Sequence, residues 1–121
     1  MPIKRILLAS TFATAVATAA GAQAHARLES SEPQAAATLD SAPKQIRLKF
    51  NEALEPAFSK IKLTDASNAE VPLPPAKVDA ADASTMSVPT PILRAGAYHV
   101  QWSTMTHDGH KAKGEFVFTV K

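Results

Sequence analysis

The sequence predicts an all-β domain, either an antiparallel β-sandwich or a Greek-key β-barrel, with about seven strands. Two observations support this class. Apolar and polar residues alternate with a period of two in several short segments, as they do in strands with one buried face. Nine prolines and other turn-forming residues divide the chain into pieces too short for a confident helix. Many short strands separated by turns are typical of sandwiches and Greek-key barrels.

The first 24 residues (1–24) predict a secretory signal peptide and are excluded from the fold. Lys4 and Arg5 precede a mostly apolar stretch over residues 6–20, and Ala22-Gln23-Ala24 is a small-x-small cleavage site. The apolar stretch is too short and too rich in alanine for a stable transmembrane anchor. We therefore expect an exported chain that consists of one domain, residues 25–121.

The strands of this domain are predicted in chain order from the alternation. Clear strands are expected at 46–50, 58–63, 98–102 and 116–120, and weaker ones at 26–31 and 85–88. The polar, proline-rich linker at 65–83 predicts loops with one short strand. In the clear strands, alternate apolar side chains are expected to face the core, among them Ile46, Leu48, Phe50, Tyr98, Val100, Trp102, Phe116, Phe118 and Val120.

Composition excludes several classes of function. Cysteine is absent, which removes disulfides, thiol redox chemistry, zinc-thiolate sites, iron–sulfur clusters and the blue-copper site. Lys4 and Arg5 account for the chain's excess of two positive charges, so residues 25–121 are formally neutral. Their charge therefore gives no argument for binding nucleic acid or an anionic membrane.

Cleavage after Ala24 would make His25 the first residue of the exported chain. Its α-amino group and its imidazole Nδ1 would then close a small chelate ring around a metal ion. The amine has to lose its proton to bind, and its ordinary pKa of about 7.7–8.0 makes the affinity weaker in acid. Ala24-His25-Ala26 is itself a small-x-small triplet, and cleavage after Ala26 would remove the chelator.

A second half-site is predicted in the segment between the last two strands, Thr106-His107-Asp108-Gly109-His110. One interpretation is a solvated turn, because Asp-Gly is a common turn dipeptide. The other is a metal half-site in which Asp108 supplies a carboxylate and His110 an imidazole, with Gly109 allowing a tight turn. Asp108 and His110 are favoured as the pair because alternate residues of an extended segment share a side. His107 is left as a polar loop residue, a secondary ligand or a competitor of His110.

The two half-sites together predict a copper site. The amine and imidazole of His25 and the imidazole of His110 give three nitrogen donors, and Asp108 adds an oxygen. Tetragonal nitrogen and oxygen coordination is preferred by Cu(II), which binds such ligands most tightly among the divalent first-row metals. The fourth histidine, His99, lies on the polar side of its strand and is interpreted as a solvated surface residue.

A family resemblance extends over essentially the whole of residues 25–121. The segments that carry it are His25-Ala26-Arg27-Leu28 with 30–33, Phe50-Asn51-Glu52-Ala53-Leu54-Glu55 with Phe58-Ser59, 95–102, Asp108-Gly109-His110, and 114–118. On these residues the chain resembles the CopC family of periplasmic copper-resistance and copper-handling proteins. The combination of a cleavage-exposed His, Phe-x-Glu and Asp-x-His is specific, although each element alone is weak.

The resemblance implies an immunoglobulin-like or cupredoxin-like Greek-key fold and one Cu(II) ion per chain in a histidine-brace site. The ligands would be His25 through its amine and imidazole, His110 through its imidazole, and Asp108 through an oxygen. Glu52 matches a family glutamate near the site and would orient the N-terminus or a ligand. The alternative for Glu52 is a solvated carboxylate at a strand end.

The resemblance also bears on cargo, location and partners. It implies a periplasmic copper carrier or sequestering protein that is not an enzyme, and a CopD-like inner-membrane copper transporter or a CopA-like multicopper oxidase as partner, by analogy alone. We expect a monomer. Some family members have a second, Cu(I)-selective site in a loop rich in methionine and histidine, but residues 64–75 contain neither. Met86 and Met105 are interpreted as core residues, which predicts a protein specific for Cu(II).

Two other classes of function stay open. A histidine brace is also the catalytic centre of lytic polysaccharide monooxygenases. This chain is short for such an enzyme, and Tyr98 and Trp102 are both expected to point inward, which leaves no evident aromatic platform for a polysaccharide. The remaining class is a structural immunoglobulin-like interaction module in which His25 is incidental.

Overall fold

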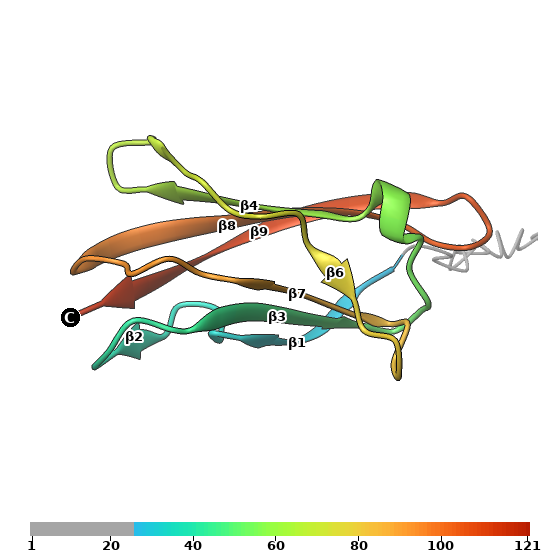
Figure 1. The fold of residues 1–121 in the computed structure, drawn as a ribbon, viewed down its shortest axis with the longest axis horizontal. Coiled ribbons are helices and arrows are strands. Elements are labelled where there is room, and N and C mark those ends of the chain that lie inside the picture. Colours follow the sequence, from blue (N-terminus) through green and yellow to red (C-terminus); the bar gives the residue numbers. More distant parts are fainter. Residues whose placement is uncertain (1–25) are drawn as a thin grey trace, which may run out of the picture.

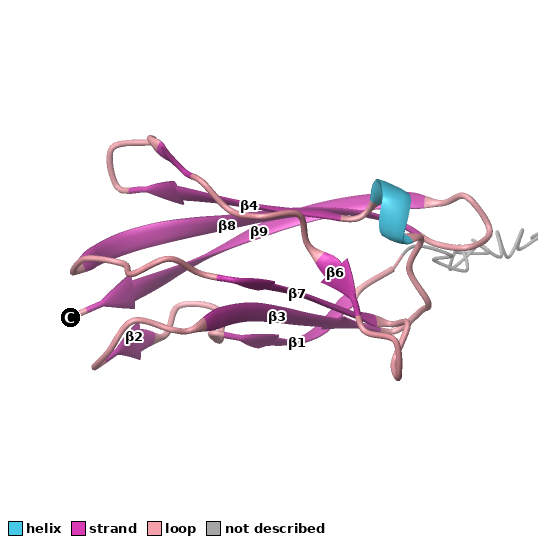
Figure 2. Ribbon diagram, viewed as in Figure 1, coloured by secondary structure: helices cyan, strands magenta, loops and turns pink. Residues whose placement is uncertain are grey.

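The computed structural model describes residues 26–121, so the expected signal peptide at 1–24 and His25 lie outside the described residues. Within 26–121, nine strands form two sheets that pack face to face (Figure 1). The helical structure of this part of the chain is one short 3-10 turn, η1 (Pro56–Phe58) (Figure 2). No helix within the same residues is long and apolar enough to cross a membrane.

The two sheets form separate layers, so the β-sandwich is correct and the closed barrel is not (Figure 1). The four-stranded sheet has the order β1 (Leu28–Glu32), β3 (Gln45–Phe50), β7 (Thr85–Pro89), β6 (Lys77–Val78). The five-stranded sheet has the order β2 (Thr38–Leu39), β9 (Lys111–Val120), β8 (Gly96–Met105), β4 (Lys60–Asp65), β5 (Glu70–Val71). Neighbouring strands are antiparallel except that β2 runs parallel to β9.

The core between the layers follows the predicted alternation. On β3, Ile46, Leu48 and Phe50 are fully buried while the interleaved side chains are exposed. The same pattern holds on β4, β7, β8 and β9, and it brings together the buried side chains of Leu63, Met86, Val88, Tyr98, Val100, Phe116, Phe118 and Val120. Each such side chain contributes about 1.5–3 kcal/mol of hydrophobic free energy, which has to replace the disulfides that the chain lacks.

The prediction of a strand over 58–63 was wrong at its start. Pro56 begins the 3-10 turn η1, and strand β4 begins only at Lys60. Proline suits the first position of a helical turn because its φ is already helical and it lacks an N–H to leave unpaired. Phe58 therefore ends on the surface with 57% of its area exposed, and it does not join the core.

Other differences concern short strands and partial burial. The linker at 65–83 was predicted to contain one short strand but contains two, β5 and β6. Strand β2 was not predicted. Each of these three strands has two residues, too few for an alternation of apolar and polar residues to be seen. Trp102 points inward as expected but is only half-buried, with its ring edge-to-face on Phe50 at 4.9 Å between centroids. Met86 is a core residue, whereas Met105 was wrongly assigned to the core and is half-buried beside a surface groove.

The longest hairpin of the sandwich, β8–β9, carries the segment that contains Asp108 and His110. The two strands pair over ten registered positions, from Gly96 opposite Val120 to Met105 opposite Lys111. The loop at residues 106–110 thus projects from the end of a long, regular ladder. In Figure 1 the described chain also begins at this end of the sandwich, beside the β8–β9 loop.

Candidate metal centre

The loop between β8 and β9 is a tight, hydrogen-bonded turn. The Thr106 N–H donates to the His110 carbonyl at 2.9 Å, and the Gly109 N–H donates to the Thr106 carbonyl at 2.9 Å. Gly109 has a φ of +87°, a left-handed conformation that glycine adopts without steric cost. The Asp-Gly turn predicted from the sequence is therefore present, and it fixes the relative positions of the residues on either side of the glycine.

Asp108 and His110 lie side by side across this turn. Nδ1 of His110 is 2.9 Å from Oδ2 of Asp108. The other carboxylate oxygen accepts a hydrogen bond from the hydroxyl of Thr106, a side chain that is only 2% exposed. The hydrogen bond from Thr106, followed by that from His110, lowers the pKa of Asp108 to about 2. Asp108 is therefore an ionised acceptor at neutral pH, held by a buried donor.

This pairing bears on which imidazole nitrogen is able to bind a metal. A carboxylate that accepts from Nδ1 favours the tautomer with the proton on that atom, so the lone pair of the neutral ring lies on Nε2. Carboxylate–histidine–metal arrangements of this kind recur in metalloproteins, because the carboxylate fixes the orientation of the ring and raises its basicity. Asp108 is thus able to bind a metal ion through one of its own oxygens, or to orient the His110 ring so that this ring binds the ion.

His107 is directed away from this pair. Its Nδ1 shares a hydrogen bond with Oε1 of Glu55, which comes just before the 3-10 turn. The backbone beside this contact is also tied down: the Glu55 N–H donates to the Met105 carbonyl at 2.8 Å, and Leu54 forms a β-bridge with Thr106. Residues 54–55 therefore hold the base of the loop, and His107 takes part in that attachment.

The first described residues are anchored at the same end of the sandwich. The Arg27 N–H donates to Oδ1 of Asn51 at 2.6 Å, and the Asn51 N–H donates back to the Arg27 carbonyl at 3.1 Å. Ala26 is 3% exposed and belongs to the core. Since Asn51 is only three residues from Leu54, which bridges Thr106, the segment 51–55 connects the start of the described chain to the loop.

The other predicted site residues are His25 and Glu52, and His99 is the remaining histidine. His25 lies outside the described residues. Glu52 is half-buried in the connecting segment and forms no hydrogen bond or ion pair with another residue of 26–121. His99 is half-buried on β8, at a position that alternates with the buried Tyr98, and is not part of the loop. Within 26–121, no group of three His, Asp or Glu side chains is placed to hold a metal ion, and Asp108 with His110 is the predicted pair of ligands that the structure brings together.

A model of the CopC domain matches residues 28–121. The chain belongs to the CopC family. It is 39% identical over 99 residues to Protein YobA of Escherichia coli strain K12, an alignment that covers 81% of this chain and 80% of that protein.

Two solved structures have a similar fold and a related sequence. CopC from Methylosinus trichosporium OB3b has a TM-score of 0.76 and 31% identity, covering 80% of this chain and 94% of its own. PcoC from Escherichia coli, described as a methionine-rich copper resistance protein, has a TM-score of 0.72 and 38% identity, covering 81% of this chain and 100% of its own. None of these three names describes an enzyme.

Three residues around this candidate site were not assigned a role from the sequence. Thr106 holds the Asp108 carboxylate, Asn51 anchors the backbone of Arg27, and Glu55 contacts His107. Asn51 and Glu55 lie in the stretch that carried the family resemblance, but their partners are 24 and 52 residues away in sequence. Thr106 alone gave a local signal, since a Thr two positions before an Asp is able to donate to it.

Proposed function

We propose that the protein binds one Cu(II) ion per chain in the periplasm and carries or sequesters copper, without acting as an enzyme. The ligands in this proposal are the α-amine and imidazole of His25, the imidazole of His110 and the carboxylate of Asp108. Glu52 orients the N-terminus or one of the ligands. Export with cleavage after Ala24 generates the free amine.

One observation carries this proposal: the described chain starts at the end of the sandwich that bears Asp108 and His110 (Figure 1). Arg27 is fixed to Asn51, and a residue two positions before Arg27 lies within about 7 Å of it along the chain. This reach supports the proposal that a terminal histidine at position 25 and the loop share one metal ion. Its amine and imidazole would add two nitrogen donors to a pair of ligands that is incomplete by itself.

The chemistry of the donors favours Cu(II) over other metals and over Cu(I). Three nitrogens and an anionic oxygen suit tetragonal Cu(II), whereas Cu(I) prefers soft thioether sulfur. PcoC is described as methionine-rich, but here residues 64–75 contain no methionine and Met86 is fully buried in the core. Copper is therefore the cargo of a single site with nitrogen and oxygen ligands in this proposal.

The cellular role follows from family and export. The PcoC relative is described as a copper resistance protein. A signal peptide predicted at 1–24 and the absence of cysteine suit a periplasmic carrier that takes no part in thiol chemistry. A CopD-like inner-membrane transporter or a CopA-like multicopper oxidase is the partner that the family context suggests.

The experiment combines mass spectrometry with copper titration. Mass spectrometry of the exported protein is expected to show His25 as the first residue, and Cu(II) is expected to saturate at one equivalent. His25→Ala should weaken binding, while Lys44→Ala, at an exposed position in the loop that precedes β3, should leave it unchanged. Equal affinity of the parent and His25→Ala would exclude the brace. Oxygen consumption with a reductant and chitin or cellulose would instead indicate the monooxygenase. A protein that neither binds copper nor consumes oxygen would be a structural interaction module.

A further inference from the structure

The outer surface of the five-stranded sheet carries a concentration of positive charge. Lys60 and Lys62 on β4 and Lys111 and Lys113 on β9 are all exposed, and they occupy positions that alternate with inward-facing residues. We call these four residues the lysine face. Among the outward positions of β4, β8 and β9, the one acidic side chain is Glu115. In a chain that is formally neutral over 25–121, this is a strongly asymmetric distribution of charge.

The charges of the lysine face are not neutralised by the protein itself. None of its four ammonium groups forms an ion pair with another residue of 26–121. On the opposite sheet the pattern differs, because Arg47 pairs with Asp79 at 3.7 Å and Lys49 with Asp82 at 3.6 Å. The lysine face therefore offers four cations to an external anion, and a partner would not first have to break an internal pair.

The same surface is hollowed. A groove of about 640 Å³ is lined by Lys60, Lys62 and Lys113, by Trp102, and by the single carboxylate of Glu115. A second groove of about 440 Å³ shares Lys60 and Lys113 and is also lined by Lys111, Met105 and Phe58. Phe58 is 57% exposed, one of the two large apolar side chains exposed in the described chain. Cations thus surround concave surfaces that also contain apolar atoms.

We propose that the lysine face is the docking site for an extended, acidic segment of a partner protein. The lysines on each strand are two residues apart, which places them about 7 Å apart along the strand. Carboxylates at alternate positions of an extended peptide have the same spacing. The grooves accept a chain between the lysine rows, and Phe58 with Met105 accepts an apolar side chain of that peptide. A flat lipid headgroup layer would not fill a recessed surface of this kind.

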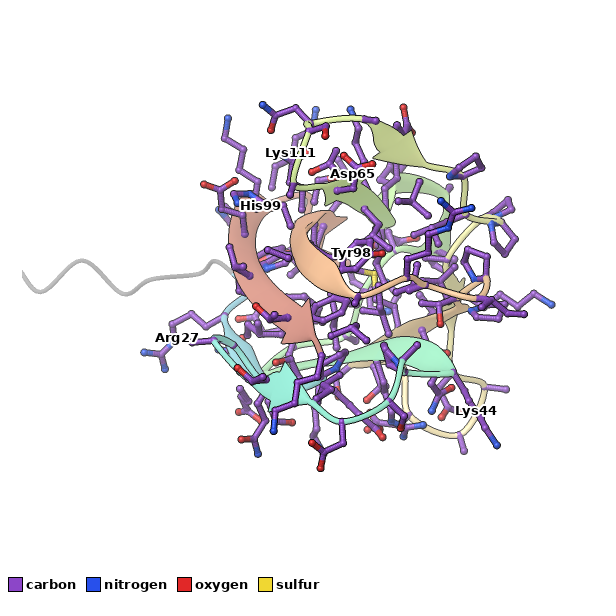
Figure 3. The ribbon with its side chains drawn as sticks, turned by 90° about the vertical axis from the view of Figure 1, so that its left-hand side faces the viewer. Arg27, Lys44, Asp65, Tyr98, His99 and Lys111 are labelled. Atoms are coloured by element: carbon purple, nitrogen blue, oxygen red, sulfur yellow. The ribbon has the colours of Figure 1, made fainter. Side chains whose placement is uncertain are left out.

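The lysine face adjoins the loop of the candidate copper site, since Lys111 directly follows His110. In Figure 3, Lys111 and His99 lie toward the outer side of the five-stranded sheet, Tyr98 lies near the middle of the molecule, and Lys44 lies on the far side. A partner bound to the lysine face would thus be close to the loop at 106–110. Docking itself needs no metal, so its test is independent of the copper proposal.

The experiment measures binding of a synthetic peptide to the metal-free chain 25–121. The probe is an acetylated ten-residue peptide with glutamate at every second position and one leucine, and the readouts are amide chemical shifts and a titration isotherm. Shifts are expected on β4, β8 and β9 around the four lysines. The affinity should fall as ionic strength rises through about 0.1 M, where the screening length is about 10 Å.

Matched variants separate position from net charge. Lys62→Glu with Lys113→Glu should weaken peptide binding by about tenfold or more, since it replaces two attractions with repulsions. Lys44→Glu with Lys77→Glu alters net charge equally at exposed positions outside the lysine face and should change affinity less than twofold. Equal losses in the two double variants would overturn the proposal. The proposal would also be overturned if the peptide does not bind while vesicles containing phosphatidylglycerol bind through the same lysines.

Discussion

Asn51 is predicted to influence copper binding without contacting the metal. Its side-chain oxygen accepts a hydrogen bond from the Arg27 N–H at 2.6 Å, and this contact fixes the chain two residues after His25. Asn51→Ala removes the acceptor, although the reciprocal bond from the Asn51 N–H to the Arg27 carbonyl remains possible. The perturbation is therefore confined to one hydrogen bond at the base of the N-terminus.

The magnitude follows from what that hydrogen bond does. A neutral hydrogen bond contributes about 0.5–1.5 kcal/mol net, and ordering one residue's backbone costs about 1–2 kcal/mol. Without Asn51, copper has to order the start of the chain as it binds. We expect Cu(II) affinity to fall by about three- to tenfold, because about 1.4 kcal/mol corresponds to a factor of ten. Asn51→Asp keeps an oxygen acceptor and should retain most of the affinity.

The assay is a competition titration with a chelator of known Cu(II) affinity, together with urea unfolding of each variant. Ile46→Val serves as the control, since it removes a buried methyl group at the other end of β3 and costs about 0.5–1.5 kcal/mol of stability. It should destabilise the fold to a similar degree and leave the copper affinity unchanged. If Asn51→Ala binds copper as tightly as the parent, or if Ile46→Val weakens binding equally, the anchoring role is refuted.

Three further outcomes are expected. Gly114→Ala should lower the free energy of unfolding by about 1–3 kcal/mol, because the added Cβ would lie 2.4 Å from Cζ2 of Trp102. It should also shift the fluorescence emission of Trp102, the single tryptophan. The loss of stability should be smaller when Gly114→Ala is combined with Trp102→Leu. Thr106→Val should raise the pKa of Asp108 from about 2 toward the ordinary value of about 3.9 in an NMR pH titration, whereas Thr106→Ser should not. Hydrogen bonds from Ser84 and then from Thr85 lower the pKa of Asp82 to about 2, so the stability that this group provides is complete above about pH 4 and is lost as the pH falls toward 2. Asp82→Asn should therefore weaken the dependence of the urea midpoint on pH between pH 4 and 2, and an unaltered dependence would contradict this assignment.

The long strands were predictable because burial of one face imposes a period of two on the sequence. Ile46, Leu48 and Phe50 show this most clearly, since β3 is central in its sheet and all three are fully buried. The prediction failed where local backbone preference was stronger than the pattern. Phe58 continues an apolar alternation in the sequence, but Pro56 sets a helical turn that turns it out to solvent.

The site was predictable only as far as its local part. The Asp-Gly turn and the proximity of Asp108 and His110 follow from the three consecutive residues Asp108, Gly109 and His110, and the structure brings the two side chains together. The contacts of Asn51 and Glu55 depend on the packing of two distant segments, which no short-range pattern encodes. The copper ligand role of His25, Asp108 and His110, like the orienting role of Glu52, stays a prediction.

Copper binding by a free N-terminal histidine is the central claim, and acetylation tests it most directly. Two preparations of the chain 25–121 are compared by Cu(II) titration and electron paramagnetic resonance, one with a free α-amine and one acetylated at His25. We predict one tightly bound equivalent with nitrogen hyperfine structure for the free amine. Acetylation should weaken the affinity by at least about tenfold, or about 1.4 kcal/mol. Equal affinity and an identical spectrum for both preparations would contradict the histidine-brace site.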